Sequence, residues 1–412
     1  MFLKNLVMKS NYKKLGEYIE LVNVINSDLY YGEVDVIGVS NNKEIIQTRA
    51  NNEGREFNNF YVVAPNAFIY NSRTSRMGDK VGLGYNDSET NFITSFNNTV
   101  FRVKNEALIP MFLFMWFKRP EFDRYVRFHS WGSSTEIFSW EEMCKTLLPI
   151  PHPDKQREIV KEYITIQNRI NLNKKLLQKL EETTQAIYKQ WFVDFEFPDE
   201  NGNPYKSNGG EMEFNEELEK DIPKGWEVKK LNSVFNFNQG SEPGSSSYCS
   251  QKISNEYVNF YRVQDIFKYN YFPELFVNKN LLKGRLFNSE DILVSLDGTI
   301  GRVFMGGEGG YSSGIRKVSS DKEYVSNPLI FCFLKSNYFK ESLNLLSGSE
   351  TTIKHAGKAI KDMYFVFDKN ICIKFSKVVE PIYRQILLKG RQDNLLEKSR
   401  ELLLSKLATI NN

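Results

Sequence analysis

The sequence predicts an α+β protein in which two mixed α/β heads, arranged as an internal repeat, are separated by two long helices of coiled-coil type. Three observations support this prediction. One helical pattern runs without interruption from 154 to 197, the chain repeats itself at a constant offset, and short β-rich runs precede each helix. The predicted boundaries are a first head at 1–153, a first long helix at 154–197, a linker at 198–221, a second head at 222–373 and a second long helix at 374–412.

The first long helix is predicted from the spacing of its apolar residues. They recur at alternating steps of three and four, which places them along one face of a helix at near-heptad period. These residues are Ile159, Tyr163, Ile166, Ile170, Leu177, Leu180 and Ile187. No Gly or Pro interrupts the pattern between Pro153 and Pro198. Roughly 37 residues at about 1.5 Å each make a rod of about 55 Å, which needs a packing partner of similar length.

The packing partner lies in the same chain. A shift of 216 residues places Ile166 on Ile382, and the same shift aligns residues 13–15 with residues 229–231. One constant offset at both ends of a unit indicates a duplicated module of head plus helix. The predicted seam between the two helices comprises Ile166, Ile170, Leu180, Ile382, Ile386 and Leu396.

The first head is predicted to combine short strands with a helix. Runs at 61–63, 67–70 and 98–103 are rich in β-branched and aromatic residues, and turn residues separate them. An apolar helix is expected at 110–117. A polar, basic loop follows the strand at 67–70, and its candidate DNA-contacting residues are Asn71, Ser72, Arg73, Thr74, Arg76 and Lys80.

Both ends of the first long helix have a distinctive sequence. Three prolines at 149–153 favour extended backbone, and Asp154 is predicted to cap the helix. Three aromatic residues at the other end allow two interpretations, a core cluster or a patch that docks a partner: Trp191, Phe192 and Phe195. Residues 198–210 of the linker have the composition of a flexible connection.

The second head repeats the features of the first. A strand and glycine-bearing turn at 290–302 correspond to 67–80, and a glycine-rich basic segment follows at 306–317. Its candidate DNA-contacting residues are Ser295, Arg302, Ser312, Ser313, Arg316 and Lys317. Guanidinium and ammonium groups pair with phosphates or guanine, and small polar side chains read other base edges. Ordinary solvated loops are the alternative for any single residue, but the presence of the loop in both copies favours DNA contact.

Composition limits the environment and the partners. The net charge is +3, from 54 basic and 51 acidic residues, so the chain as a whole is not a nucleic-acid polycation. No apolar run reaches about 18 residues and no signal peptide is recognisable, which predicts a cytoplasmic protein without a membrane span. The scattered cysteines and histidines predict reduced thiols and no metal site: Cys144, Cys249, Cys332, Cys372, His129, His152 and His355.

Motifs for bond chemistry are missing from the sequence. A methyltransferase acting on exocyclic amines would carry an Asn/Asp-Pro-Pro-aromatic tetrad, but Asn203-Pro204-Tyr205 lacks the second proline. The glycine-rich run at 306–310 does not open a helix, and no GxxxxGK[ST] run is present for ATP. The sequence therefore predicts no catalytic residue and no cofactor in this chain.

Three strings resemble the specificity (S) subunits of Type I restriction–modification systems. They are LLPIPHPDKQREIV at 147–160, AIYKQWFVDF at 186–195 and IPKGWEVKKL at 222–231. The resemblance covers essentially the whole chain and implies a head–helix–head–helix layout, in which each head is a target recognition domain for one half of a split DNA sequence. One departure is that residues 367–373 lack the proline-rich hinge that precedes the first helix.

The same resemblance implies partners and cofactors. The two helices would pair antiparallel, set the spacer between the half-sites and bind two modification (M) subunits. The M subunits would carry S-adenosylmethionine, restriction (R) subunits would use ATP and Mg, and double-stranded DNA would be the ligand. The main alternative is a single-chain DNA methyltransferase or nuclease with an unrecognised active site. A helical scaffold without DNA recognition is a weaker alternative.

Overall fold

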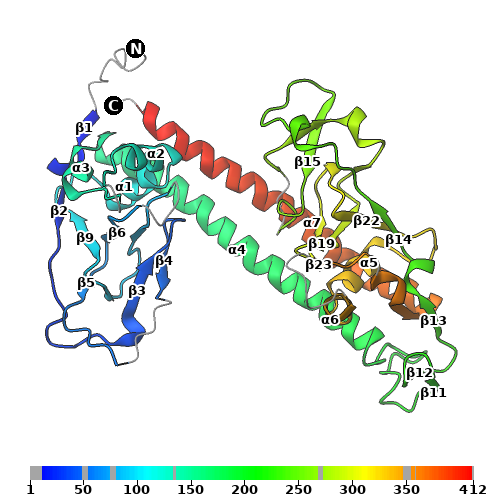
Figure 1. Ribbon diagram of the computed structural model, residues 1–412. Coiled ribbons are helices and arrows are strands. Elements are labelled where there is room, and N and C mark those ends of the chain that lie inside the picture. Colours follow the sequence, from blue (N-terminus) through cyan, green and yellow to red (C-terminus); the bar gives the residue numbers. More distant parts are fainter. Residues whose placement is uncertain are drawn as a thin grey trace. The chain divides into compact units, whose positions relative to one another are not determined.

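The computed structural model describes residues 12–48, 54–74, 80–132, 136–267, 272–346, 354–357 and 359–410. The chain forms two compact units (Figure 1), the first from 1–168 with 397–412 and the second from 169–396. The helices α4 (Pro153–Phe192) and α7 (Lys369–Lys406) each contribute a segment to both units.

The head in the first unit consists of two four-stranded sheets and one two-stranded pair. The strand orders are β2-β9-β6-β7, β4-β3-β8-β5 and β1-β10. Among these pairs only β3 and β8 run parallel. The strands are β1 Tyr12–Lys14, β2 Ile19–Leu21, β3 Val36–Val39, β4 Ile45–Gln47, β5 Tyr61–Val63, β6 Ala67–Asn71, β7 Leu83–Tyr85, β8 Phe92–Thr94, β9 Asn98–Val103 and β10 Leu147–Pro149.

The head in the second unit has the same topology. Its strand orders are β14-β22-β18-β20, β16-β15-β21-β17 and β13-β24, and the parallel pair is β15 with β21. Each strand takes the place of its counterpart in chain order, so the predicted internal repeat is confirmed. The strands are β13 Glu227–Lys230, β14 Asn236–Gln239, β15 Tyr257–Tyr261, β16 Phe276–Asn278, β17 Leu286–Phe287, β18 Ile292–Ser295, β20 Val303–Met305, β21 Gly309–Tyr311, β22 Ile315–Ser319 and β24 Tyr364–Phe367, with a further short pair β19 Asp297–Gly298 and β23 Lys354–His355.

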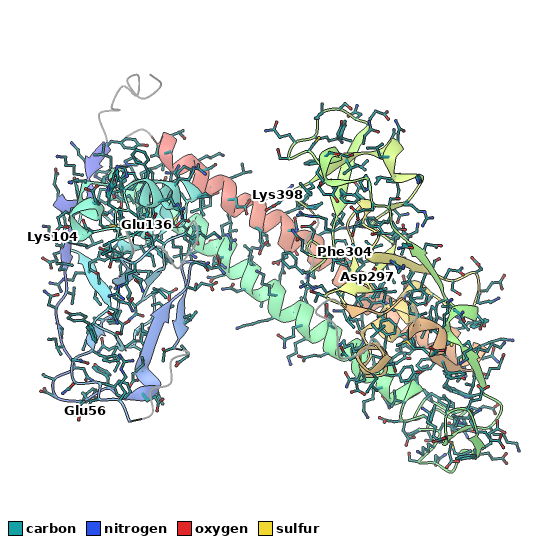
Figure 2. All side chains as sticks on the ribbon, viewed as in Figure 1. Glu56, Lys104, Glu136, Asp297, Phe304 and Lys398 are labelled. Carbon is teal, nitrogen blue, oxygen red and sulfur yellow. The ribbon has the colours of Figure 1, made fainter. Side chains whose placement is uncertain are left out.

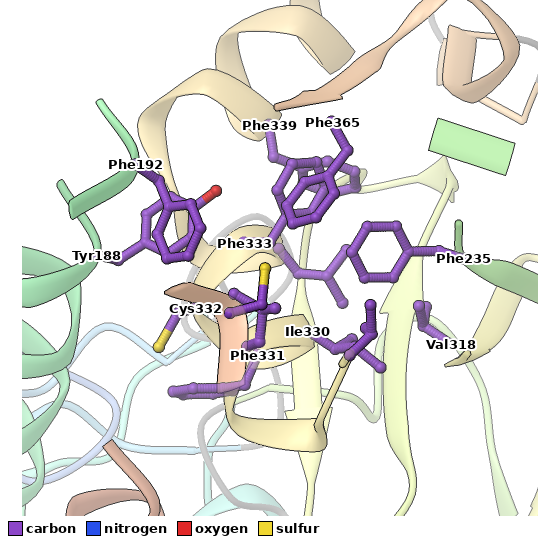
Figure 3. Close-up of a cluster of buried hydrophobic side chains, with 14 of the residues drawn as sticks. Tyr188, Phe192, Phe235, Val318, Ile330, Phe331, Cys332, Phe333, Phe339 and Phe365 are labelled. Atoms are coloured by element: carbon purple, nitrogen blue, oxygen red, sulfur yellow. The ribbon is translucent and has the colours of Figure 1, made fainter. Parts of the chain in front are cut away.

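Short helices complete the core of each head. The first head has α1 Pro110–Phe117, α2 Pro120–Phe128 and α3 Trp140–Lys145, and the second has α5 Asn327–Lys335 and α6 Asn337–Leu346. In the second head the ring of Phe333 from α5 lies 5.3 Å from Phe235 and 5.4 Å from Phe365, between the strands and the helices (Figure 3). The abundant aromatic residues therefore fill the core, as the sequence predicts.

The two long helices pack against each other within each unit, and they run antiparallel. In the first unit the Arg400 guanidinium donates to Gln167 Oε1 at 3.0 Å. In the second unit the rings of Tyr188 and Trp191 lie 5.9 and 5.7 Å from the ring of Phe375. The first half of α4 thus meets the end of α7, and the second half of α4 meets the beginning of α7. The structure places all six predicted seam residues at buried or half-buried positions: Ile166, Ile170, Leu180, Ile382, Ile386 and Leu396.

A buried glutamine joins the first helix to its head. Gln156, in the first turns of α4, donates from its amide to Ala107 O at 2.7 Å and to Pro151 O at 2.8 Å. Its Oε1 accepts a hydrogen bond from Ile109 N at 2.8 Å. One side chain therefore connects the helix, the proline hinge and the segment before α1.

The second long helix begins by a different device. Asp368 Oδ1 accepts a hydrogen bond from Ile371 N at 2.9 Å, which caps the helix. The position that corresponds to Gln156 holds Cys372, which is buried in the apolar core. The helix therefore begins at Lys369, five residues before the predicted start at 374, because the cap comes from Asp368 rather than from a proline hinge.

The linker at 198–221 is folded, contrary to the prediction of a flexible connection. Asp199 Oδ1 accepts hydrogen bonds from Asn201 N at 2.8 Å and from Asn203 N at 2.9 Å. The ring of Tyr205 stacks on Phe197 at 4.6 Å. A hairpin follows, formed by β11 (Met212–Asn215) and β12 (Lys220–Pro223). The Asn, Asp and Gly residues that looked flexible in sequence instead form these turns.

The buried seam predicts a large difference between two substitutions on α7. Ile386→Asp should lower the free energy of unfolding by about 4 kcal/mol or more, because it removes a buried side chain and buries an unpaired carboxylate. Val378→Asp is the matched control, because Val378 is 48% exposed whereas Ile386 is fully buried. Urea unfolding followed by circular dichroism measures both. Equal, small effects would contradict the seam.

Candidate nucleic-acid interface

One inter-strand loop occupies the same topological place in both heads. It joins β6 to β7 in the first head and β18 to β20 in the second. A backbone hydrogen bond closes each loop, from Asn71 N to Gly82 O at 2.9 Å and from Ser295 N to Arg302 O at 3.0 Å. These are the two loops that the sequence marks as candidates for contact with DNA.

The beginning of the first loop is held by local and long-range hydrogen bonds. Asn71 Oδ1 accepts from Arg73 N at 2.9 Å, which turns the chain directly after β6. Thr74 N donates to Glu136 O at 3.0 Å, and the Thr74 hydroxyl donates to the same oxygen at 3.3 Å (Figure 2 labels Glu136). The backbone is fixed on both sides of Arg73, and the Arg73 side chain is exposed.

The remaining candidates of the first loop differ in accessibility. Ser72 is half-buried, and its carbonyl accepts a hydrogen bond from Phe138 N at 2.8 Å. Lys80 is exposed at the end of the loop, whereas Thr74 is buried. Arg76 lies outside the described residues. Thr74 therefore shapes the loop and does not itself reach a ligand, because its side chain is covered.

An exposed tryptophan lies beside the first loop. Trp131 pairs with Ile137 through backbone hydrogen bonds of 3.2 and 3.0 Å, and Ile137 also forms a backbone bridge with Arg73. The Trp131 side chain is 71% exposed. The sequence pattern does not mark Trp131 as a contact residue, since an aromatic residue in an aromatic-rich head is as easily part of the core. Because base edges are read by apolar contacts as well as by hydrogen bonds, its exposure next to an arginine makes it a further candidate for nucleic-acid contact.

The turn of the second loop is built around a buried serine. Ser295 Oγ donates to Thr299 O at 2.6 Å and accepts from Arg302 N at 2.9 Å. The Arg302 guanidinium donates to Val263 O at 3.1 Å and remains half-buried. Ser295 therefore holds the turn in shape, whereas Arg302 retains part of its accessible surface.

Arg316 lies beside this loop, on β22. Its guanidinium donates to Ser313 O at 2.5 Å and lies 3.8 Å from the Asp297 carboxylate (Figure 2 labels Asp297). Burial lowers the pKa of Arg316, and the charge of Asp297 acts in the opposite direction. The cation is thus oriented by the two turns that flank it, with Ser313 half-buried at the surface.

Two other candidates of the second head do not join this group. Ser312 is buried, with its backbone N–H donating to Tyr261 O at 2.9 Å. Lys317 is adjacent to Arg316 on β22 and so points to the opposite face of the sheet, where it pairs with Asp291 at 3.4 Å. The structure brings together Ser313, Arg316 and the 296–302 turn, and it does not bring Lys317 to them.

A glutamine that the sequence does not predict as a contact residue lies beside Ser313 and Arg316. Gln239 is exposed at the end of β14, and its amide donates to Ser313 O at 3.1 Å. Glutamine is a common reader of adenine. No sequence signal marks this residue, because only the pairing of β14 with β22 brings it to the loop.

The aromatic residues at the end of α4 form a core and not a docking patch. Trp191, Phe192 and Phe195 are all buried. Phe192 lies 5.1 Å from the ring of Phe375, and Phe195 lies 5.4 Å from the ring of Trp226. The interpretation as a partner-binding surface was wrong in this structure, because the beginning of α7 and the beginning of the second head cover these rings.

The described residues show two further absences. They contain no helix long and apolar enough to cross a membrane. Across the same part of the chain, no group of three or more His, Cys, Asp or Glu side chains is placed to hold a metal ion.

Comparison with known proteins places these features in one family. The family model described as "Type I restriction modification DNA specificity domain" matches residues 10–182 and 223–366, once in each half of the chain. The chain is 26% identical over 352 residues to the Type I restriction enzyme MjaIX specificity subunit of Methanocaldococcus jannaschii, covering 82% of this chain and 77% of that protein. It is 22% identical over 372 residues to the HindI specificity subunit of Haemophilus influenzae, covering 77% of this chain and 80% of that protein.

A solved structure shares the fold. The S subunit of a Type I restriction–modification system from M. genitalium superposes with a TM-score of 0.57 at 13% identity, covering 100% of this chain and 99% of that one. The duplicated heads, the antiparallel helices and the family match in both halves lead to one conclusion. The chain belongs to the Type I restriction–modification DNA specificity family.

Proposed function

We propose that this chain is the DNA sequence-specificity subunit of a Type I restriction–modification complex, in which each head reads one half of a bipartite DNA target. One observation carries the proposal: the same inter-strand loop in both heads has arginine and small polar residues in it or directly beside it. Two copies of one surface suit a target in two parts, because the same kind of loop can engage each half-site. The two relatives compared above are named as specificity subunits of Type I restriction enzymes.

The proposed contacts divide into side chains that touch DNA and side chains that shape the loops. The exposed cations Arg73 and Lys80 can pair with phosphates or with guanine O6 and N7. The proposed contact set is Asn71, Ser72, Arg73, Lys80, Arg302, Ser313 and Arg316, with Trp131 and Gln239 added from the structure and Arg76 from the sequence alone. Lys317 is left out, because it points to the opposite face of the sheet and pairs with Asp291. The buried Thr74, Ser295 and Ser312 hold the loop backbones.

The paired helices have two proposed roles. They set the spacer between the half-sites, and they dock two M subunits. With the aromatic cluster at the end of α4 buried, docking must use outward-facing residues. Leu172 and Leu388 are 67% and 57% exposed, and the repeat offset of 216 residues makes them counterparts. Two equivalent apolar positions suit two copies of one partner.

The chemistry of the complex is assigned to other chains. S-adenosylmethionine would bind to the M subunits, and ATP with Mg to the R subunits, so this cytoplasmic chain would contribute recognition and assembly alone. A single-chain DNA methyltransferase or nuclease is not favoured, because the sequence lacks the methylation tetrad. A scaffold without DNA recognition would leave the polar loops of both heads without a role.

Substitution of one loop cation should affect one half-site. Arg73→Ala, tested in cells that carry the chain with M subunits, should weaken discrimination at the first head's half-site by about 1–3 kcal/mol, since a bidentate arginine contact is lost. Methylome sequencing would show a degenerate base in that half and an unchanged second half. Arg102→Ala, on an exposed surface pair with Glu20, is the control. Loss of both half-sites together would contradict independent reading.

Lengthening both helices should lengthen the spacer. Seven residues inserted after Asn168 and seven after Leu396 keep the seam in phase and add about 10 Å, or roughly three base pairs. Methylome sequencing should report a spacer longer by that amount, with both half-sites kept. The same insertion in the exposed turn at 206–209 serves as the control. An unchanged spacer would remove the proposed role of the helices in spacing.

The docking surface can be tested separately from DNA reading. Leu172→Asp combined with Leu388→Asp should weaken M-subunit binding at least tenfold, about 1.4 kcal/mol, because charge is placed in an apolar contact. Stability should change little, since both side chains are exposed. Analytical ultracentrifugation with purified M subunit measures the stoichiometry, and an unaltered complex of two M subunits per chain would rule out these positions.

A further inference from the structure

In the first head, a buried ion pair forms hydrogen bonds with both the backbone N–H and the backbone C=O of one residue. Val81 N donates to Asp123 Oδ1 at 3.0 Å, and Val81 O accepts from Lys43 Nζ at 3.1 Å. The Lys43 ammonium also donates to Asp123 Oδ1. The side chain of Lys43 is 4% exposed and that of Asp123 is 13% exposed. Three separate parts of the head meet here: the turn between β3 and β4, helix α2, and the end of the loop that follows β6.

The backbone of Lys43 is in an unfavourable conformation. Its φ is 61°, in the left-handed region where Gly and Asn are the usual residues. The turn is closed by hydrogen bonds from Lys43 N to Ser40 O at 3.2 Å and from Ser40 N to Glu44 O at 2.9 Å. Burial also lowers the pKa of Lys43, with Asp123 acting in the opposite direction. A glycine would suit the turn better, so a lysine here indicates a role for the ammonium group.

The ion pair fixes the chain directly after Lys80. Val81 follows Lys80 in the sequence, and Gly82 O accepts the hydrogen bond from Asn71 N that closes the loop. The other end of the loop is tied at Thr74 to Glu136. Both ends of the polar loop are therefore bound to elements outside the sheet. Buried ion pairs add little net stability compared with apolar residues, and in some proteins they specify one arrangement of the groups that they join.

The second head supports its equivalent loop differently. The strand register makes Gly301 the counterpart of Val81. Helix α6 is the counterpart of α2, and Leu343 Cδ1 on α6 lies 3.7 Å from the position of a Cβ on Gly301. Six residues separate Ser295 from Arg302, whereas ten separate Asn71 from Gly82. The longer loop loses somewhat more conformational entropy on closing, and the ion pair offsets part of that cost.

We propose that the Lys43–Asp123 pair is a positioning element for DNA reading by the first head: by fixing both peptide groups of Val81, it sets the direction in which Lys80 leaves the sheet. This inference rests on the proposed function of the chain. It assigns a role in specificity to two residues that do not touch DNA, and it assigns that role to the first half-site alone.

The test replaces the pair without leaving a buried charge. Lys43→Met with Asp123→Leu removes both partners of Val81 and keeps the site apolar. In cells that carry the full chain with M subunits, methylome sequencing should show about tenfold or greater loss of discrimination in the first head's half-site, with the second half-site unchanged. Lys43→Arg keeps a cation within reach of Val81 O and should preserve the motif.

Matched controls separate positioning from stability. Ile93→Ala empties a fully buried position on β8, in a different apolar cluster from Val81. It should lower the melting temperature at least as much as the double substitution and keep both half-sites. If the double variant does not fold, Lys43→Gly is the variant to test. It removes the ammonium group and also relieves the backbone strain at position 43, because glycine adopts a positive φ without cost. A folded variant with an unchanged motif overturns the inference, whereas a wild-type chain that directs no bipartite motif overturns the proposed function instead.

Discussion

The structure depends on the burial of one apolar seam between α4 and α7. An amphipathic helix in a protein takes most of its stability from packing of its apolar face, and each helix removes the apolar face of the other from solvent. In the second unit the seam merges with the core of the head, because Tyr188, Trp191 and Phe192 all contact Phe375. In the first unit it merges with the core through Ile159, Tyr163, Leu404 and Leu407. The helices are therefore parts of the head cores and not separate connectors.

The two heads are duplicated in topology but differ in their loops. Both heads keep one topology, down to the single parallel strand pair, while the loops between corresponding strands differ in length and support. The first loop is held by a buried ion pair, and the second by hydrogen bonds of the buried Ser295 with Thr299 O and Arg302 N. Because the strands keep one topology while the loops vary, substitutions in the loops of one head can change its contacts without altering the other head.

Hydrophobic periodicity and the internal repeat were sufficient to predict most of the fold from the sequence. The strands at 61–63 and 98–103 and the helix at 110–117 were placed correctly, because local patterns specify them. The folded linker and the start of α7 at Lys369 were missed, since they depend on specific turn and cap hydrogen bonds. For the candidate interface, the sequence predicts the two polar loops but not the burial of Thr74, Ser295 and Ser312. Gln239 and Trp131 could not be predicted from the sequence, because strand pairing and backbone bridges bring them beside the loops.

The two heads share one topology, so we expect each of them to act as an equivalent reading module. The most direct measurement is the methylated motif of a chain in which the second head, 223–367, is replaced by a copy of the first, 12–152, with both helices kept. We expect a palindromic motif, in which the first half-site is repeated in inverted orientation around a spacer. A direct repeat of the half-site, or retention of the original second half-site, would contradict it.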